Sequence, residues 1–212
     1  MRAMLLLIAA AMSVTGCSAS IPGLTAAAPS GSELYRDDFA SASSGWDRVK
    51  HDGGIMDYDS GSYRMLVTAP DSNLWSTPGR KFGDVRIEVD ANKLAGPDAN
   101  RIGLICRSDG SSHYFFLISS DGYYGLGIFT DGEAALLGQP AMEVSPAIAR
   151  GAAPNHLRMD CAGSQLAGYV NEVKVAQTED ARLKNGEVGI LAGVFEEPGA
   201  DIVFDNFVVL QP

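Results

Sequence analysis

The sequence predicts an all-β protein built as an antiparallel sandwich or barrel, and two observations carry that prediction. Apolar residues Val85, Ile87 and Val89 alternate with charged neighbours, and a period of two places them on one face of a half-buried strand. Dipeptides that readily enter positive φ in hairpin turns recur between such segments. They are Asp52-Gly53, Asp109-Gly110, Asp121-Gly122, Asp131-Gly132 and Asn185-Gly186.

Short strand-like segments follow one another along the chain, and no long amphipathic run interrupts them. Expected strands are 61–69, 85–92, 101–107, 113–119, 123–130, 156–161, 166–177, 187–195 and 201–210. One short helical turn is expected over 145–151, because Ser145 can cap it, Pro146 suits its first position and Gly151 suits its end.

The first sixteen residues are typical of a bacterial lipoprotein signal peptide. Met1 and Arg2 precede the apolar run 3–12, which has the length of a secretory core and is too short to span a bilayer. The segment 13–17, Ser-Val-Thr-Gly-Cys, resembles a lipobox. Cys17 is therefore the expected lipidation site, carrying fatty acyl chains such as palmitate that hold the chain at a membrane. Ser18 suits sorting to the outer membrane in a diderm cell.

The remainder divides into a tether and one folded domain. Residues 17–32 are mostly Ala, Ser, Gly and Pro without charge, a composition typical of a flexible linker. The domain is expected over 33–212, outside the cytoplasm and attached to the cell membrane or the outer membrane. With 16 Lys and Arg against 26 Asp and Glu, the formal net charge is −10, which argues against nucleic acid as a partner.

Cys106 and Cys161 remain as a pair in an exported chain, where an oxidising compartment favours a disulfide. Both lie in expected strands, 55 residues apart. Two separate buried thiols are the alternative.

Four segments carry a resemblance to a known superfamily. They are Arg36-Asp37-Asp38-Phe39, Ser44-Gly45-Trp46, residues 119–127 and Phe204-Asp205-Asn206-Phe207. Together they resemble the concanavalin A-like jelly roll, and within it the laminin G-like and 3-keto-disaccharide-hydrolase-type domains. The resemblance covers residues 33–210. It implies an antiparallel jelly-roll sandwich more than any one activity, since the superfamily holds lectins, binding modules and glycosidases. One departure is Asn171-Glu172, where such domains often have Asn-Gly.

The glycosidases of this superfamily need the carboxylate spacing E-x-D-x-x-E. This chain has Glu88 and Asp90, but Lys93 stands in the last position. The solvent face of an antiparallel strand explains both carboxylates without chemistry. No metal-spaced His and Cys cluster and no nucleophile motif appears in the sequence. The expectation is therefore a protein that is not an enzyme and has no catalytic residue.

Glycan binding needs only aromatic faces for sugar C–H groups and polar side chains for hydroxyls. The candidates are Trp75, Arg107, Asp109, Tyr114, Tyr123 and Tyr124. Packing in the core is the alternative for each aromatic residue, and strand alternation requires one of each adjacent aromatic pair to face inward. Gly122, Gly125 and Gly127 either admit a ligand close to the backbone or mark curvature.

A structural calcium ion is the one expected cofactor. The resemblance implies that the first and last strands lie side by side, which would bring Asp37 or Asp38 near Asp205 and Asn206. Their oxygens are hard ligands suited to Ca²⁺.

These observations predict a lipid-anchored, noncatalytic binding module outside the cytoplasm, preferably for a carbohydrate or a cell-wall polymer. The alternative is an envelope lipoprotein that scaffolds or binds another protein, and a hydrolase on sugar derivatives comes third.

Overall fold

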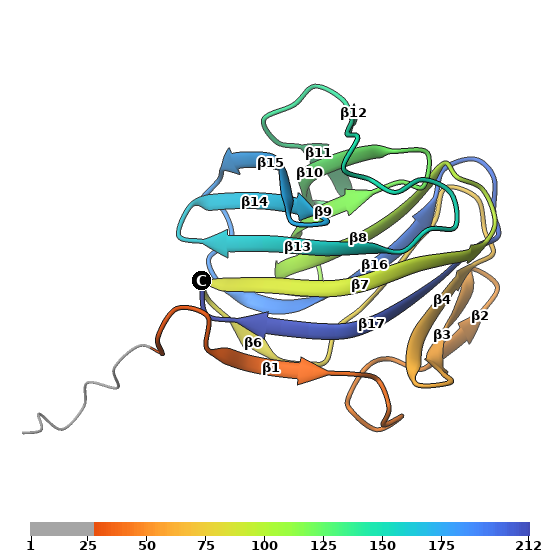
Figure 1. The fold of residues 1–212 in the computed structure, drawn as a ribbon, viewed down its shortest axis with the longest axis horizontal. Helices are drawn as coiled ribbons and strands as arrows, with labels where there is room; N and C mark the ends of the chain where they lie inside the picture. Colours follow the sequence, from red (N-terminus) through yellow and green to blue (C-terminus); the bar gives the residue numbers. More distant parts are fainter. Residues whose placement is uncertain (1–27) are drawn as a thin grey trace, which may run out of the picture.

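The computed structural model describes residues 28–212, which form two antiparallel sheets packed face to face (Figure 1). One sheet has nine strands in the order β15-β14-β13-β7-β17-β4-β3-β2, with β1 also paired to β17. Its strands are β1 (Glu33–Asp37), β2 (Val49–His51), β3 (Gly54–Asp59), β4 (Ser62–Val67), β7 (Val85–Ala95), β13 (Asn155–Ala162), β14 (Gln165–Val170), β15 (Val173–Glu179) and β17 (Ala200–Leu210).

The other sheet has eight strands in the order β11-β10-β9-β8-β16-β5, with β12 paired to β10 and β6 to β16. They are β5 (Asn73–Ser76), β6 (Lys81–Phe82), β8 (Asn100–Ser108), β9 (His113–Ile118), β10 (Tyr123–Thr130), β11 (Glu133–Leu136), β12 (Glu143–Val144) and β16 (Gly186–Val194). The all-β sandwich predicted from the strand periodicity is confirmed, and so are the nine expected strand regions.

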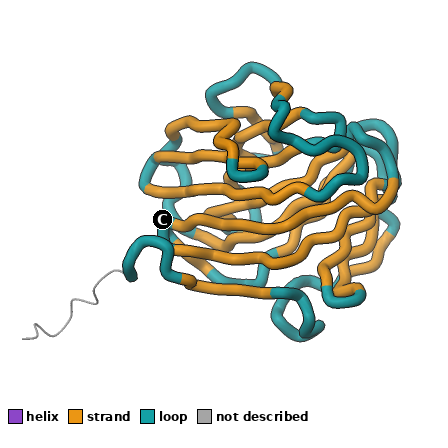
Figure 2. The backbone as a smooth tube through the Cα atoms, in the orientation of Figure 1, coloured by secondary structure: helices purple, strands orange, loops and turns teal. Residues whose placement is uncertain are grey.

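The expected helical turn over 145–151 is wrong, because residues 28–212 contain strands and loops alone (Figure 2). The Ile148 amide donates to the Ser145 carbonyl, which makes one isolated turn. The Asn155 side chain then accepts from the Ala149 amide and donates to its carbonyl. The Asn155 side chain thus bonds the Ala149 amide and carbonyl, which would otherwise be available for the hydrogen bonds of a helix.

The main core lies between the sheets and follows the predicted alternation. Along β7 the apolar residues from Val85 to Ala91 are buried, whereas Arg86, Glu88 and Asp90 face outward. Strand β9 differs, since all six of its residues are buried. Tyr114 and Phe116 join the main core, while Phe115 belongs to a second cluster on the outer side of the eight-stranded sheet.

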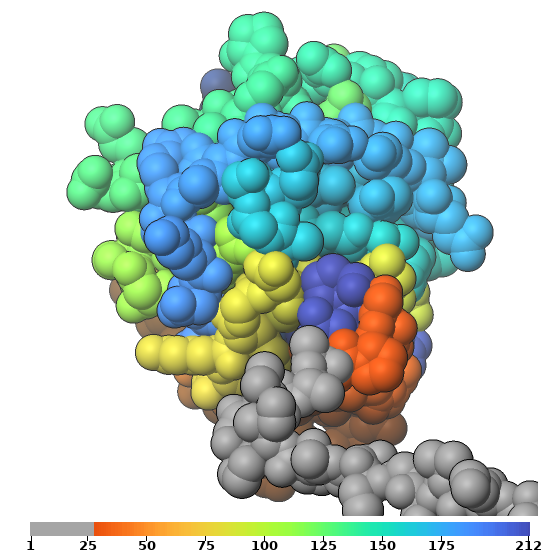
Figure 3. Space-filling view, turned by 90° about the vertical axis from the view of Figure 1, so that its left-hand side faces the viewer, coloured from red at the N-terminus to blue at the C-terminus, as the bar shows by residue number. Residues whose placement is uncertain are grey.

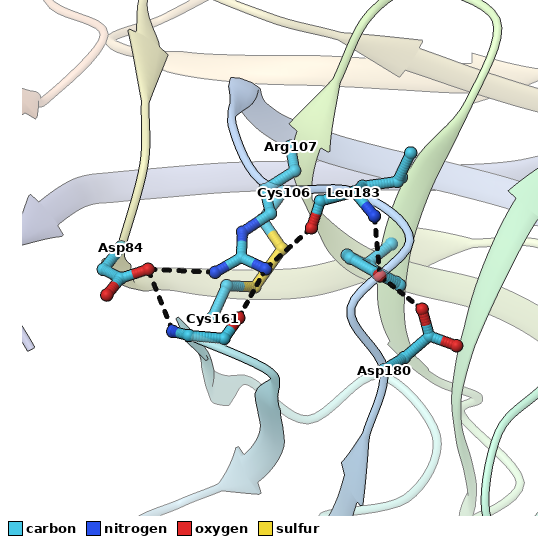
Figure 4. The surroundings of a disulfide bond; sticks show 8 residues. Asp84, Cys106, Arg107, Cys161, Asp180 and Leu183 are labelled. Carbon is cyan, nitrogen blue, oxygen red and sulfur yellow. Dashed lines mark hydrogen bonds and ion pairs between the residues drawn. A yellow bond between two sulfur atoms is a disulfide. The ribbon is translucent and has the colours of Figure 1, made fainter.

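A disulfide joins the two sheets through the core. Cys106 of β8 and Cys161 of β13 are bonded and fully buried, which confirms the predicted pair. At this end of the sandwich, three segments lie side by side in Figure 3: the yellow segment before β7, the cyan turn after β13 and the blue segment before β16. Hydrogen bonds from Arg107 hold them around the disulfide (Figure 4).

Every strand and both apolar clusters fall within residues 33–210, so the described segment contains a complete two-layer fold. Within that segment we find no helix of the length and apolar character needed to cross a membrane. The signal peptide, Cys17 and most of the tether lie outside the described residues.

Candidate functional site

The outer side of the eight-stranded sheet holds a groove of about 310 Å³, within the size range of ligand pockets. We call it the apolar groove. Side chains from β5, β8, β9, β10, β11 and β16 line it together with two loop residues. The lining residues are Asn73, Trp75, Arg101, His113, Phe115, Leu117, Phe129, Ala134, Leu136, Met142, Leu191 and Phe195.

Strand alternation puts the floor of the groove on one face. His113, Phe115 and Leu117 are two residues apart on β9 and point away from the main core. Leu117 pairs with Gly103 of β8 and Gly125 of β10. Leu191 of β16 in turn lies opposite Gly103. Large apolar side chains therefore alternate with glycines across the sheet, which leaves the hollow between them.

Two further glycines, Gly127 of β10 and Gly193 of β16, are needed because a neighbouring side chain lies directly over each of them. A Cβ on Gly127 would stand 2.4 Å from Cζ of Phe115, and one on Gly193 would stand 2.1 Å from Oδ1 of Asn73. The sequence raised two explanations for Gly125 and Gly127, close approach of a ligand or curvature. In the structure, the Leu136 side chain is nearest to a Cβ at Gly125, and the Ala135 carbonyl oxygen and the Phe115 ring are nearest to one at Gly127.

Three rings form the aromatic end of the groove. His113 stacks on Phe129 with ring centroids 5.3 Å apart, and Trp75 lies 6.0 Å from His113 and 6.4 Å from Phe129. Trp75 is 37% exposed although it lies on this apolar surface. Its ring therefore offers a flat face to a ligand.

His113 is the most buried polar side chain of the groove, at 4% exposure. Burial lowers its pKa from 6.5 to about 4, against a small opposing effect of the Asp109 charge, so the ring is neutral near pH 7. Among residues 28–212, no side chain or backbone group makes a hydrogen bond with its ring nitrogens. A neutral imidazole has one donor and one acceptor, and both remain for a ligand.

Arg101 supplies the only charged side chain that lines the groove within the described segment. Its Nη1 donates to the Val194 carbonyl at 2.5 Å and to Oδ1 of Asn73 at 3.1 Å. The guanidinium lies 3.8 Å above the centre of the Phe195 ring, a cation–π contact. Burial lowers the pKa of Arg101, but an arginine remains charged at any physiological pH.

This arrangement can bind a ligand. Within the described chain, the lining of the groove lacks the two carboxylates that glycoside hydrolysis requires. Of the described residues, no Asp, Glu, Ser or Cys lines the groove. Glycoside hydrolysis by the two-carboxylate mechanism needs two Asp or Glu side chains at the ligand. An aromatic face, an aliphatic floor and a few polar groups are what a recognition site needs.

Of the six binding candidates from the sequence, Trp75 is the one that lines the groove. Alternation along β8 would place Arg107 on the same face as Arg101. Its φ of 54° breaks that alternation, and the side chain is instead buried with Asp84 Oδ1 at 3.0 Å and the Gly163 and Leu183 carbonyls (Figure 4). Asp109 accepts hydrogen bonds from Ser111 and Ser112 amides in a turn, and these bonds lower its pKa.

The three tyrosine candidates lie in three different places. Tyr114 is fully buried in the main core, and its hydroxyl donates to Asp180 at 2.5 Å. Tyr123 is 40% exposed outside the groove. Tyr124 donates to Glu143 at 2.8 Å and lines a second, shallow depression beside Val144 and Val173. The structure thus does not bring these side chains into one site with Trp75.

The four expected calcium ligands do not converge. The first and last strands do pair, but Asp37 lies opposite Phe207. Its carboxylate accepts hydrogen bonds from the Trp46 indole, the Tyr35 hydroxyl and the Phe39 amide.

Asp38 accepts from the Ala40 amide, and Asn206, beside Asp205, donates its side-chain amide to Asp90. In the described part of the chain, no three His, Cys, Asp or Glu side chains are grouped to hold a metal. A calcium ion at these residues stays a prediction from the sequence, and no ligand set supports it.

The incomplete glycosidase spacing lies on the opposite side of the molecule from the groove. Glu88 and Asp90 point outward from β7, in the nine-stranded sheet, where the His156 ring lies 2.8 Å from Asp90 and 3.8 Å from Glu88. Lys93 points inward and pairs with Asp98. These carboxylates thus belong to a group of surface polar contacts with His156.

Six groove residues with polar or aromatic side chains were not among the sequence candidates: Asn73, Arg101, His113, Phe115, Phe129 and Phe195. The signal for His113 was present, because it shares the outward face of β9 with Phe115 and Leu117. Asn73 and Phe195 reach the groove only through the pairing of β5 with β16, which a single sequence does not reveal.

Comparison with known proteins identifies solved structures that have a similar fold. No protein-family profile and no curated protein sequence matches the chain. A carbohydrate-binding module from Bacillus subtilis aligns with a TM-score of 0.64 at 19% identity, covering 79% of this chain and 96% of that one. A Bacillus subtilis protein of unknown function with a galectin-like fold gives 0.63 at 15% identity, over 86% and 97%.

A β-1,3-1,4-glucanase (lichenase) from a mouse hindgut metagenome gives a TM-score of 0.59 at 12% identity, over 84% of this chain and 98% of that one. At these identities the likeness shows the fold alone. The fold is the galectin-like, concanavalin A-like jelly-roll sandwich that the resemblance in the sequence implied.

Proposed function

We propose that this domain is a noncatalytic module that binds carbohydrate in the apolar groove. The observation that carries the proposal is Trp75, a tryptophan held 37% exposed beside the stacked rings of His113 and Phe129 in a 310 Å³ hollow. Sugar rings have apolar C–H faces that pack on such a ring. Asn73, Arg101 and His113 supply hydrogen bonds for hydroxyls around it.

Two further observations support binding rather than turnover. The groove's lining has no carboxylate in the described chain, and the third carboxylate position of the glycosidase spacing is Lys93. The similar structures include both a carbohydrate-binding module and a lichenase, so their names agree on the ligand class and differ on catalysis.

We further propose that the chain is exported and anchored by lipid at Cys17, with the domain outside the cytoplasm. The support is the charged start, the apolar run 3–12 and the small residues before the cysteine. Metabolic labelling with a palmitate analogue in the native host tests it. Label should enter the wild-type chain and be absent from Cys17→Ala, and equal labelling of both would contradict lipidation at this residue.

Binding of a partner protein in the envelope is the second candidate. Val144 and Val173, each 52% exposed, flank the shallow depression beside Tyr124, and exposed apolar side chains that gather together are typical of interaction sites. Crosslinking in cells through a photoreactive residue at Val173 should then capture one defined envelope protein, and no captured protein would remove this alternative.

A glycan array with the segment 28–212 tests carbohydrate binding. We expect specific binding to one class of glycan, which Trp75→Ala weakens at least tenfold because the stacking surface is lost. Tyr123→Ala is the matched control, since Tyr123 is 40% exposed but lies outside the groove. Its affinity should equal that of the wild type.

Thermal unfolding verifies that both variants are folded. Absence of binding across the array by a folded protein would contradict the proposal for those glycans. Equal losses in the Trp75 and Tyr123 variants would place binding elsewhere.

A further inference from the structure

The apolar groove contains a cation, Arg101, that has no carboxylate within 4.0 Å in the described chain; Asp71 acts on it only through a longer-range Coulombic interaction. Among residues 28–212, ten arginines are described, and seven of them pair with a carboxylate within 4.0 Å. Arg80, Arg101 and Arg150 do not. Arg101 alone of the three lines the groove, in a chain whose formal net charge is −10.

The Arg101 guanidinium is held in place by neutral groups. Its two hydrogen bonds, both from Nη1, go to the Val194 carbonyl and the Asn73 amide oxygen. Its face rests on the Phe195 ring. A guanidinium has five N–H donors in a rigid fork that matches an oxyanion. Nε and Nη2 therefore remain free to bind one, without a side-chain carboxylate competing for them.

The other end of the groove is polar but uncharged. His113 is 96% buried, lines the groove, and has no hydrogen bond to its ring nitrogens in the described segment. Between the two ends lie aliphatic side chains such as Leu117 and Leu191. A fully hydroxylated sugar would leave hydroxyl groups without partners over such a floor, at a cost in affinity. The described lining of the groove thus offers a ligand one charged group, Arg101, with neutral polar or apolar contacts elsewhere.

We propose that the ligand is an acidic sugar, whose carboxylate or sulfate group binds Arg101 while its apolar face lies on Trp75. This inference rests on the proposed function and names the class of carbohydrate. A charged hydrogen-bonded pair of this kind discriminates strongly against the uncharged analogue, because Nε and Nη2 of the half-buried guanidinium then stay without an oxyanion partner.

Three matched pairs of probes test the charge alone. They are oligogalacturonate and its methyl ester, hyaluronan oligosaccharides and their methyl ester, and dextran sulfate and dextran. Calorimetry with residues 28–212 should give at least one pair in which the acidic member binds about tenfold tighter or more. The three pairs also separate carboxylate from sulfate.

Arg101→Gln should reduce that preference to within about twofold, while binding of the neutral member persists. Arg101→Lys keeps a charge without the fork and should give an intermediate preference; it also serves if the glutamine variant fails to fold. Arg150→Gln is the control, because Arg150 is another arginine without an ion pair in the described chain and lies outside the groove. The Arg150→Gln variant should keep the wild-type preference for the acidic member of the pair.

The outcomes separate the two proposals. Equal affinity for acidic and neutral members, or an acidic preference that survives Arg101→Gln, overturns this inference and leaves sugar binding in place. If no sugar binds but octyl sulfate does, and Arg101→Gln abolishes it, the anion site is correct and sugar binding is wrong. If no anionic probe binds, the inference is overturned.

Discussion

The outer faces of the two sheets differ in chemistry although both belong to one sandwich. The nine-stranded sheet turns outward a set of ion pairs, among them Arg158 with Asp160 at 2.5 Å and Arg64 with Asp201 at 2.6 Å. The eight-stranded sheet turns outward the cluster Ile105, Phe115, Leu117 and Leu191.

The difference indicates that the nine-stranded sheet supports the fold, whereas the eight-stranded sheet offers a surface to a ligand. An antiparallel sheet with one polar face is complete when its inner face is packed, as the alternating burial along β7 shows. Strand β9 is buried on both faces, yet the cover over its outer side leaves a 310 Å³ hollow. An apolar surface that the chain itself does not fill is where a ligand gains most from leaving water.

The largest expected effect comes from removing the link between the two sheets. The double variant Cys106→Ala, Cys161→Ala should lower the free energy of unfolding by about 4 kcal/mol, because the disulfide closes a 55-residue loop. Urea unfolding measures it. Binding in native buffer should persist, since neither cysteine lines the groove. An unchanged stability would show that the sheets do not depend on the bond.

Protonation of His113, which lines the groove, should make the free energy of unfolding depend on pH. Its pKa is about 4 in the folded chain against 6.5 for the free side chain, because of burial. Between these values the unfolded chain binds more protons, so stability falls as the pH is lowered through this window, by roughly 2 to 3 kcal/mol in total.

The variant His113→Phe isolates this contribution. The difference in unfolding free energy between pH 7 and pH 4 should be smaller in the variant than in the wild type by that amount. Denaturant unfolding at several pH values measures it, and identical pH profiles would contradict a buried neutral ring.

The charged outer face should matter little for either property. Arg158→Ala removes the pair with Asp160 and the contact with the Tyr169 ring at 4.2 Å, which should cost about 1 kcal/mol of stability. Glycan affinity measured by calorimetry should not change. A loss of affinity in a folded Arg158→Ala protein would place the ligand on the wrong face.

The smallest effect concerns the hairpin between β14 and β15. Asn171 and Glu172 both have positive φ, 48° and 69°, the geometry that Asn-Gly readily supplies. Glu172→Gly should therefore raise the free energy of unfolding by about 0.5 to 1 kcal/mol. Thermal unfolding measures the gain, and a decrease would mean that the glutamate makes a compensating contact.

Much of the fold could be predicted from the sequence, because the alternation in β7, the short apolar run of β9 and the Asp-Gly turns are local signals. The turn at Asn171-Glu172 forms despite its departure from Asn-Gly, since Asn171 is held by the His156 amide and the Ala147 carbonyl. Short strands such as β2, β5, β6 and β12 have no periodicity of their own and exist only through pairing. The prediction of a helical turn over 145–151 was wrong because the side chain of Asn155, six residues after Ala149, bonds the Ala149 amide and carbonyl.

The site was less predictable than the fold. Trp75 could be named as an aromatic candidate, but the register between β16 and β5 decides which residues join it. Arg107 was expected at the ligand and Arg101 was not, and one positive φ at Arg107 separates the two. The Arg107 side chain turns away from the groove at the disulfide end of the sandwich, where three segments that are distant in sequence meet around the Arg107 guanidinium.

The most direct test of the account is an amide and side-chain chemical-shift map of residues 28–212 during titration with the tightest-binding glycan. We predict that the largest shifts fall on the Trp75 indole, Arg101 and His113, on the eight-stranded sheet. Shifts centred on Glu88, Asp90 and His156, on the nine-stranded sheet, would contradict the assignment of the binding face.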